Sequence, residues 1–255
     1  GMITHRRAFD DMNTIIRRFR EESDRPISAL IAPTLIRDLS RLAEVKAAGT
    51  DMVGVAIDAA TPELFARWRG AGVRGPHDWE HYWTTVAEAV RLFGRFKVGV
   101  HLIVGLGETE QEMIATIQRA HDLGAHTHLF SFFPEGGTAM DDHPQPSYGQ
   151  YRRVQLARYI INREYGRYEQ MEFNEAGQVM DFGVPTAELI RFGEPFMTSG
   201  CPGPDGCVAC NRPFGNERAG QPMRNYPFPP EPEDIELIRY QLREYADDRY
   251  PGDRH

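Results

Sequence analysis

Apolar residues follow two patterns along this chain, one typical of helices and one typical of buried strands. Phe9, Met12 and Ile16 recur at spacings of three and four residues, which predicts an amphipathic helix over residues 4–22. Short apolar runs bounded by turn residues predict strands at 27–34, 51–58, 97–106 and 127–133. Helical patterns between them predict helices at 35–49, from 61 onward, at 78–93 and at 109–123.

Strands and helices that alternate in this way are typical of parallel βα units, whose strands are covered on both faces. The sequence therefore predicts an α/β fold. In such sheets, open or closed, ligands bind at the carboxyl ends of the strands. The candidates for a site are therefore the residues that follow each predicted strand, namely Thr34, Asp58, 105–108 and 134–138.

The second part of the chain has a different pattern. A predicted helix at 148–165 and a strand pair at 171–183 precede a stretch rich in Gly and Pro from residue 185 onward. An extended proline-rich segment at 225–233 and a charged helix at 234–245 follow. We expect an α/β unit over residues 1–183, which the resemblance described below implies is a partial barrel, and a C-terminal extension over residues 184–255.

Composition excludes several classes of protein. Of 255 residues, 41% are hydrophobic and 26% are charged, which is ordinary for a folded, water-soluble protein. The formal net charge of −8 lacks the basic excess of a general nucleic-acid binder. No apolar run approaches the roughly 20 residues that cross a bilayer, and the sequence does not open with a secretory signal. We therefore expect no nucleic-acid or membrane partner and a cytoplasmic location.

All three cysteines of the chain lie close together, at Cys201, Cys207 and Cys210. An odd number of clustered thiols in a reducing compartment favours a metal or cluster site over disulfides. Thiolates suit an iron–sulfur cluster or Zn²⁺, and the spacing of Cys207 and Cys210 lets both sulfurs point at one metal. A zinc site would need a fourth ligand, and no histidine lies nearby in sequence. Free thiols without metal are the third interpretation.

A second candidate site is the predicted turn between the strand at 97–106 and the helix at 109–123. Gly105 and Gly107 let the backbone approach a flat ligand closely, and free amides at the start of the helix can hold its polar edge. A purely architectural role of these glycines is the alternative, because glycine is common at βα turns.

Together with its neighbours, this turn resembles the radical SAM superfamily, in particular the branch that contains biotin synthase and the lipoyl synthases. The similarity rests on four segments that occur in order within residues 27–140, at 48–51 (AGTD), 61–63 (TPE), 103–109 (IVGLGET) and 134–140 (PEGGTAM). The resemblance implies a partial (β/α) barrel of the TIM type with an extended C-terminal segment.

In that family the motif G-x-I-x-G-x-x-E contacts S-adenosylmethionine (SAM). The resemblance implies that Ile103, Gly105 and Glu108 bind this cofactor, with Gly137 from the later segment. His101 occupies the first glycine position of the motif. Its imidazole lies either near the cofactor or substrate, or in the core beside a neighbouring strand.

Two carboxylates carry alternative interpretations. Asp58 ends its strand, where the family often contacts the SAM ribose or the substrate; capping the helix that begins near Thr61 is the structural alternative. Glu108 is either a cofactor contact or a first-turn acid that favours the helix dipole. We expect Asp58 to face the ligand.

The sequence departs from the family at the cluster that generates the radical. Radical SAM enzymes bind a [4Fe–4S] cluster through CxxxCxxC after the first strand, whereas no cysteine precedes Cys201 here. The first strand and its loop are thus expected to be absent, because the sequence is truncated or another polypeptide supplies them. An uncovered parallel edge is a liability, so we expect a partner subunit or self-association at that edge.

The segments around the cysteines resemble the tail of the two-component lipoyl synthases. The similar stretches are 198–201 (TSGC), 210–214 (CNRPF), 216–218 (NER) and 224–228 (RNYPF). The resemblance implies an auxiliary [4Fe–4S] cluster at Cys201, Cys207 and Cys210, with zinc at the same cysteines as the alternative. It also implies sulfur insertion into an unactivated carbon of an octanoyl chain, carried on an acyl-carrier or lipoyl-domain protein. Without the radical-generating cluster, we expect this chain to be inactive alone.

Two other classes of function compete with this one. The first is a non-catalytic binding subunit stabilised by zinc or a cluster. The second is an ordinary βα-barrel enzyme that uses His101 with Asp58 or Glu108 as acid and base.

Four further histidines could be read as metal ligands, but structural roles are expected for them. His77 and His81 are four residues apart on a predicted helix, but the pattern is not HExxH, so we expect a packed helix face. His126 and His128 share one face of a predicted strand and are expected to flank the sheet.

Overall fold

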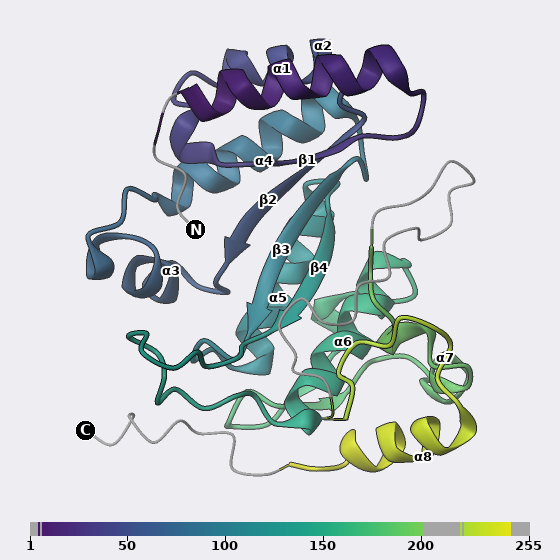
Figure 1. Cartoon of the computed structure of the whole chain (residues 1–255). Helices are drawn as coiled ribbons and strands as arrows, with labels where there is room; N and C mark the ends of the chain where they lie inside the picture. The colour runs from purple at the N-terminus through teal and green to yellow at the C-terminus, as the bar shows by residue number, and fades with distance from the viewer. Residues whose placement is uncertain (1–4, 6, 201–219, 221, 246–255) are drawn as a thin grey trace.

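The computed structural model describes residue 5, residues 7–200, residue 220 and residues 222–245. Its centre is a sheet of four parallel strands in the order β1-β2-β3-β4 (Figure 1). The strands are β1 (Ser28–Ile31), β2 (Met52–Asp58), β3 (Val98–Val104) and β4 (His126–Ser131). The predicted α/β fold with a partial β/α barrel is confirmed.

Helices that precede or connect the strands cover one face of the sheet. They are α1 (Arg7–Glu22), α2 (Leu42–Ala47), α3 (Pro62–Trp68), α4 (Trp79–Phe93) and α5 (Glu110–Asp122). On β3 the residues Val98, Val100 and Leu102 face these helices and are at most 1% exposed. Helix α5 lies behind β3 and β4 in Figure 1. This burial of alternate apolar side chains holds the helices to the sheet.

The opposite face of the sheet carries a different set of residues, and we call it the inner face. Paired positions across neighbouring strands place its side chains in rows, one of which joins Ala56, His101 and His128. The residues of this face are Leu30, Gly54, Ala56, Gly99, His101, Ile103, His126, His128 and Phe130. Several of them are only partly buried, so the inner face is open over part of its area.

The chain after β4 packs beside the sheet. Its elements are α6 (Tyr148–Asn162), the antiparallel pair β5 (Glu172–Phe173) and β6 (Val179–Asp181), α7 (Ala187–Ile190) and α8 (Pro232–Gln241). Short 3₁₀ turns complete the described structure, at Pro33–Leu35, Leu39–Arg41, Ala71–Val73, Tyr168–Gln170 and Glu194–Phe196. Residues 149–161 of α6 are all buried, because later segments cover the side of this helix that the sheet leaves open.

The predicted helix at 35–49 is wrong in its first half. Only α2 is α-helical there, and two 3₁₀ turns precede it. The Asp38 side chain accepts a hydrogen bond from the Ser40 amide at 3.0 Å, which gives the backbone a local alternative to a continuous helix. The other predicted helices and the strand pair at 171–183 are confirmed, whereas α7 was not predicted.

The boundary between residues 183 and 184 stays a prediction. Described residues on its two sides are in direct contact: Arg152 of α6 donates to the carbonyls of Met223 and Arg224. Within the part of the chain that the structure describes, no helix is long and apolar enough to cross a membrane.

Candidate functional site

Strands β2, β3 and β4 end at one edge of the sheet, and the predicted site residues lie along or near that edge. Asp58 is the last residue of β2. Residues 105–109, which we call the 105–109 turn, connect β3 to α5. The loop of residues 132–147 follows β4. Parallel strands bring these three segments together because their carboxyl ends point the same way.

The 105–109 turn requires glycine at its first position. Gly105 has φ +104°, and a Cβ atom there would lie 2.6 Å from Cδ of Pro146. Gly107 has φ +122°. The turn ends in a capping box, in which Thr109 and Glu112 each accept a hydrogen bond from the other's amide. The sequence therefore fixes both the turn and the start of α5.

Glu108 points its carboxylate back onto this turn. Oε1 accepts from the Gly105 amide at 2.7 Å, and Oε2 accepts from the Leu106 amide at 2.9 Å. The residue is 3% exposed, and burial raises the pKa of Glu108 to about 7, against the opposing pull of these two amides. The Gly105 and Leu106 amides are therefore already bonded within the chain, and ligand binding by amides at the start of the helix stays a prediction. A direct contact of Glu108 with SAM stays a prediction.

Asp58 is held by an arginine of the following helical connection. Its Oδ2 accepts a hydrogen bond from Nη1 of Arg69, which also donates to the Ala56 carbonyl. Burial raises the pKa of Asp58, while the Arg69 guanidinium acts in the opposite direction. The backbone of Asp58 has φ +66°, which turns the chain sharply at the end of β2.

The capping alternative for Asp58 is wrong. Thr61 is the N-cap of α3, and its Oγ1 accepts from the Leu64 amide at 3.2 Å. The Asp58 side chain is 24% exposed, so part of it stays accessible at the edge of the sheet.

Two aromatic residues enclose the 105–109 turn, and sequence reasoning did not identify them. Trp68 Nε1 donates to the Leu106 carbonyl at 3.0 Å. His143 Nε2 donates to the Gly105 carbonyl at 2.8 Å, and its ring lies 5.8 Å from that of Trp68. Each contact joins residues 38 positions apart, so no local motif indicates it.

The remaining predicted cofactor residues are not gathered at one point. Ile103 lies on the inner face, one residue before the end of β3. His101 lies further from the edge, with its ring 5.5 Å from that of His128 and 5.3 Å from that of Phe130. Burial lowers the pKa of His101. Gly137 is exposed in the loop after β4 with φ +79°, and nothing lies within 4 Å of where its Cβ would be.

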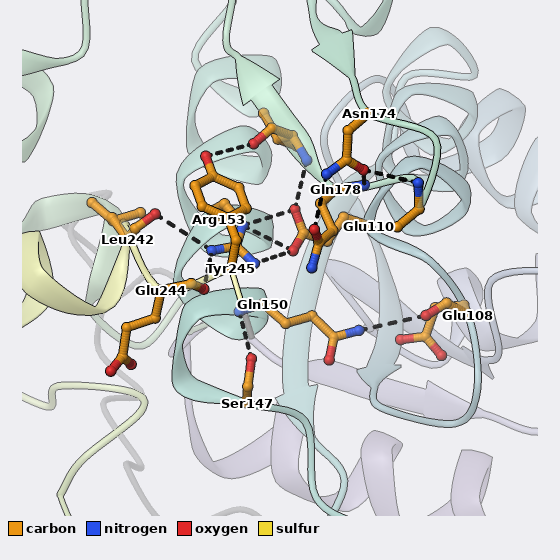
Figure 2. Close-up of polar contacts among 12 residues, drawn as sticks. Glu108, Glu110, Ser147, Gln150, Arg153, Asn174, Gln178, Leu242, Glu244 and Tyr245 are labelled. Carbon is orange, nitrogen blue, oxygen red and sulfur yellow. Dashed lines mark hydrogen bonds and ion pairs between the residues drawn. The ribbon is translucent and has the colours of Figure 1, made fainter. Parts of the chain in front are cut away.

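A buried ion pair next to the turn ties the later part of the chain to α5. Figure 2 shows Glu110 facing Arg153 of α6, whose Nη2 donates to Oε1 at 2.6 Å. The side chains of the pair are 1% and 0% exposed. Glu110 also accepts from the Val179 amide, and Arg153 also donates to the Glu244 carbonyl (Figure 2). This network is structural, and it leaves Glu110 no free oxygen for a ligand.

Cys201, Cys207 and Cys210 lie outside the described residues. The described chain reaches Gly200 along the inner face, where Nδ1 of His128 donates to the Ser199 carbonyl at 2.5 Å. Among the residues that the structure describes, no group of three or more His, Cys, Asp or Glu side chains could hold a metal ion.

The metal interpretation of His77 and His81 is not supported by their surroundings. Helix α4 begins at Trp79, so His77 lies outside it. His77 contacts the Tyr82 hydroxyl, and Nε2 of His81 donates to the Pro33 carbonyl at 2.9 Å. The two imidazoles therefore bind different partners.

Residues 5–120 match the family model described as the Radical SAM superfamily. No curated protein matches the chain. A radical SAM superfamily domain is therefore found at residues 5–120, and it includes β1, β2, β3 and the 105–109 turn. Proteins of this superfamily in general bind SAM and a [4Fe–4S] cluster.

The residues of the matched segment suit SAM better than they suit a [4Fe–4S] cluster. The matched segment contains no cysteine, so it offers no thiolate to a [4Fe–4S] cluster. For SAM the chemistry of the donors is suitable: Asp58 offers a partly accessible carboxylate to hydroxyl groups, and Ile103 offers an apolar surface to a flat ring. The chemistry of these side chains thus suits SAM, whereas the matched segment has no thiolate for the cluster.

Proposed function

We propose that this chain acts in the branch of radical SAM proteins that resembles the biotin and lipoyl synthases. In this proposal it binds SAM at the carboxyl ends of β2 and β3 and carries an auxiliary [4Fe–4S] cluster at Cys201, Cys207 and Cys210. Its reaction is sulfur insertion into an octanoyl chain on an acyl-carrier or lipoyl-domain protein. The observation that carries the proposal is the 105–109 turn beside Asp58 within the matched domain.

Each SAM residue has a separate task. Asp58 accepts hydrogen bonds from the ribose, and Arg69 keeps its carboxylate in place. Ile103 packs against the adenine, and Gly105 keeps side-chain atoms away from the strand end. Glu108 acts indirectly, because its carboxylate is bonded to the turn and holds its shape. His101 and Gly137 complete the predicted set of cofactor contacts.

The cysteines supply the second part of the proposal. Three thiolates suit an iron–sulfur cluster with one open iron, which is the arrangement that a sulfur donor needs. The hydrogen bond from His128 holds Ser199, two residues before Cys201, on the inner face of the sheet. This supports a role for the cysteine segment in chemistry on that face.

Bound SAM supplies a 5′-deoxyadenosyl group, which in this superfamily becomes the radical that removes hydrogen from carbon. Since residues 5–120 contain no cysteine, we propose that another polypeptide supplies the cluster that starts this reaction. Strand β1 is a suitable place for it: among the described residues β1 pairs with β2 alone, and the Leu30 side chain on its inner face is 58% exposed. A second copy of this chain at β1 is the other form of this proposal.

Metal analysis tests the cysteine site. After anaerobic reconstitution, we expect about four irons per chain and a broad visible absorption, both lost when all three cysteines are changed to Ala. Ser199→Ala keeps every thiol and is the matched control, which we expect to retain the iron. One zinc and no iron would instead favour a non-catalytic binding subunit, an alternative already favoured by the lack of cysteine in the matched domain.

SAM binding tests the other site. Asp58→Asn should weaken SAM binding by about tenfold in equilibrium dialysis, because a carboxylate accepts more strongly than an amide. Asp51→Asn is the matched control: Asp51 is paired with Arg20 near the opposite end of the same strand. If the wild-type chain binds no SAM, or if both variants lose the same affinity, the proposed SAM site is wrong.

Light scattering tests whether another polypeptide binds at strand β1, the edge of the sheet. We expect association of the chain with itself or with a cluster-bearing partner, and Leu30→Glu should weaken it. A strictly monomeric chain that also fails to capture such a partner would contradict this part of the proposal.

A further inference from the structure

A cavity of about 640 Å³ lies on the inner face, at the opposite end of the sheet from the proposed SAM site. Residues of all four strands line it, among them Ser28, Met52 and His128, together with Lys97 directly before β3. Its other side is formed by Arg158 of α6 and by Met197 in the segment that precedes Gly200. Arg158, Lys97, Met52 and Met197 have no role in the proposed SAM or cysteine sites.

Arg158 is a buried cation that forms no ion pair with a carboxylate among the described residues. The residue is 8% exposed, and its Nη2 donates to the Pro195 carbonyl at 2.9 Å. Its Nε is buried and donates to no described residue. Burial lowers the pKa of Arg158 to about 10, so the group is still charged at neutral pH. A buried charge that lacks a counter-ion is costly unless something else pairs with it.

The other two buried arginines of α6, Arg152 and Arg153, differ from Arg158 because side chains accept their hydrogen bonds. Arg153 has Glu110 as its counter-ion, and Arg152 donates to Gln155, Gln241 and two backbone carbonyls. The nearby carboxylate of Glu194 does not serve Arg158 in this way. It accepts from the Tyr159 hydroxyl at 2.8 Å and from Nη2 of Arg163 at 2.6 Å.

The charges along the cavity wall favour an anion. Lys97, Arg158 and Arg163 line it as cations, against Glu194 as the single acid in the lining. Burial lowers the pKa of His128 to about 3, so this imidazole is neutral and adds hydrogen-bonding capacity without charge. Met52 and Met197 supply apolar wall. The lining therefore combines one buried guanidinium with surface for an apolar body.

We infer that this cavity binds a small organic anion, whose carboxylate or phosphate pairs with the guanidinium of Arg158 while its apolar part lies against Met52 and Met197. Arginine suits either group because its planar N–H donors match the spacing of two oxygens. The cavity shares His101 with the proposed cofactor contacts but involves neither the 105–109 turn nor the cysteines, so anion binding can be tested separately from the proposed function.

The test uses three probes on the whole chain: hexanoate, inorganic phosphate, and hexylamine as a cation of the same length as hexanoate. Isothermal titration should show saturable binding of hexanoate or phosphate and none of hexylamine. The stronger of the two anions identifies the group that the cavity prefers. In parallel, NMR signals of the Met52 and Met197 methyl groups should shift on titration of the wild-type chain, which locates the ligand without a mutation.

Arg158→Met should weaken binding of the preferred anion by at least tenfold. Arg163→Met is the matched control: it removes a cation of the same wall that is already paired with Glu194, and should change the affinity by less than about threefold. The variant with all three cysteines changed to Ala should bind the anion as the wild type does, whatever becomes of the metal.

Three results would overturn the inference. They are no saturable binding of either anion up to about 10 mM, equal binding of hexylamine, and unchanged affinity in Arg158→Met. If Arg158→Met does not fold, the methyl shifts of the wild-type chain decide: shifts confined to residues away from the cavity would also refute it.

Discussion

The two ends of the sheet differ in how their polar groups are satisfied. At the carboxyl end, Glu108 is bonded to the amides of its own turn and Asp58 to Arg69. At the amino end, Arg158 is buried beside a cavity and forms no ion pair with any residue that the structure describes. The polar side chains at the carboxyl end, which carries the 105–109 turn, are thus bonded to other groups of the chain. At the amino end, the charge of Arg158 is available to pair with a ligand. The family resemblance thus indicates a site at the carboxyl end of the sheet, whereas the buried guanidinium of Arg158 indicates one at the amino end.

The sharpest test of this comparison is within α6. Arg153→Met should lower the free energy of unfolding by about 3–5 kcal/mol, because it leaves Glu110 buried without its partner. Arg158→Met should be close to neutral, since it removes a buried charge that forms no ion pair within the described part of the chain. Urea denaturation measures both. Similar large losses in the two variants would show that Arg158 is structurally paired after all.

The turn at the carboxyl end should be nearly as sensitive. Gly105→Ala combines an unfavourable φ with a Cβ 2.6 Å from Pro146, and we expect a loss of about 2–4 kcal/mol. Gly94→Ala is the matched control, because it has φ +98° but nothing within 4 Å of the added Cβ. Backbone strain alone should cost about 1 kcal/mol there. Equal losses would mean that the contact with Pro146 is unimportant.

The two ends should also respond to pH in opposite directions. Glu108 has a pKa raised from 4.5 to about 7, so its contribution to stability is full below pH 4.5 and is lost as pH rises through 7. His128 has a pKa lowered from 6.5 to about 3, so its contribution is present above pH 6.5 and is lost as pH falls through 3. Each group changes the unfolding free energy by up to about 1.4 kcal/mol per pH unit.

Unfolding curves across this pH range should separate the two groups. Glu108→Gln should remove a component that falls between pH 4.5 and 7, and His128→Gln should remove one that rises between pH 3 and 6.5. If the two substitutions changed the pH dependence of the unfolding free energy in the same direction, the opposite pKa shifts assigned to Glu108 and His128 would be wrong.

The smallest expected effect is at the start of α5. Thr109→Ala removes the side chain that caps the helix after the turn, at a cost of about 1 kcal/mol. Thr84→Ala is a suitable control because Thr84 is exposed within α4 and bonds only the Glu80 carbonyl. If Thr109→Ala costs no more than this control, the turn does not depend on the cap.

The order of strands and helices in the barrel was predictable from periodicity alone. Buried parallel strands produce apolar runs that stand out between amphipathic helices, and the glycines of the 105–109 turn mark a strand end. The start of α3 was also readable, since Thr61 followed by Pro62 is a local cap signal. These features depend on residues close in sequence.

Contacts between distant residues were not predictable. Nothing in the local sequence shows that Trp68 and His143 enclose the turn, because each pairs with a residue 38 positions away. Helix α6 has three arginines and has the composition of a surface helix, yet residues 149–161 are buried by segments that follow much later. That Arg158 forms no ion pair with a described residue is evident only from the folded structure.

The strand order has a consequence for how the chain folds. Each strand of the sheet is a neighbour of the one before it, so the sheet can grow by addition in the order of synthesis, with short loop closures at each step. The amino-end cavity cannot form this way, because the segment at Ser199 must return to His128 across 71 residues. We expect pulse-labelled hydrogen exchange to protect the amides of β2 and β3 first and those around Thr198 last.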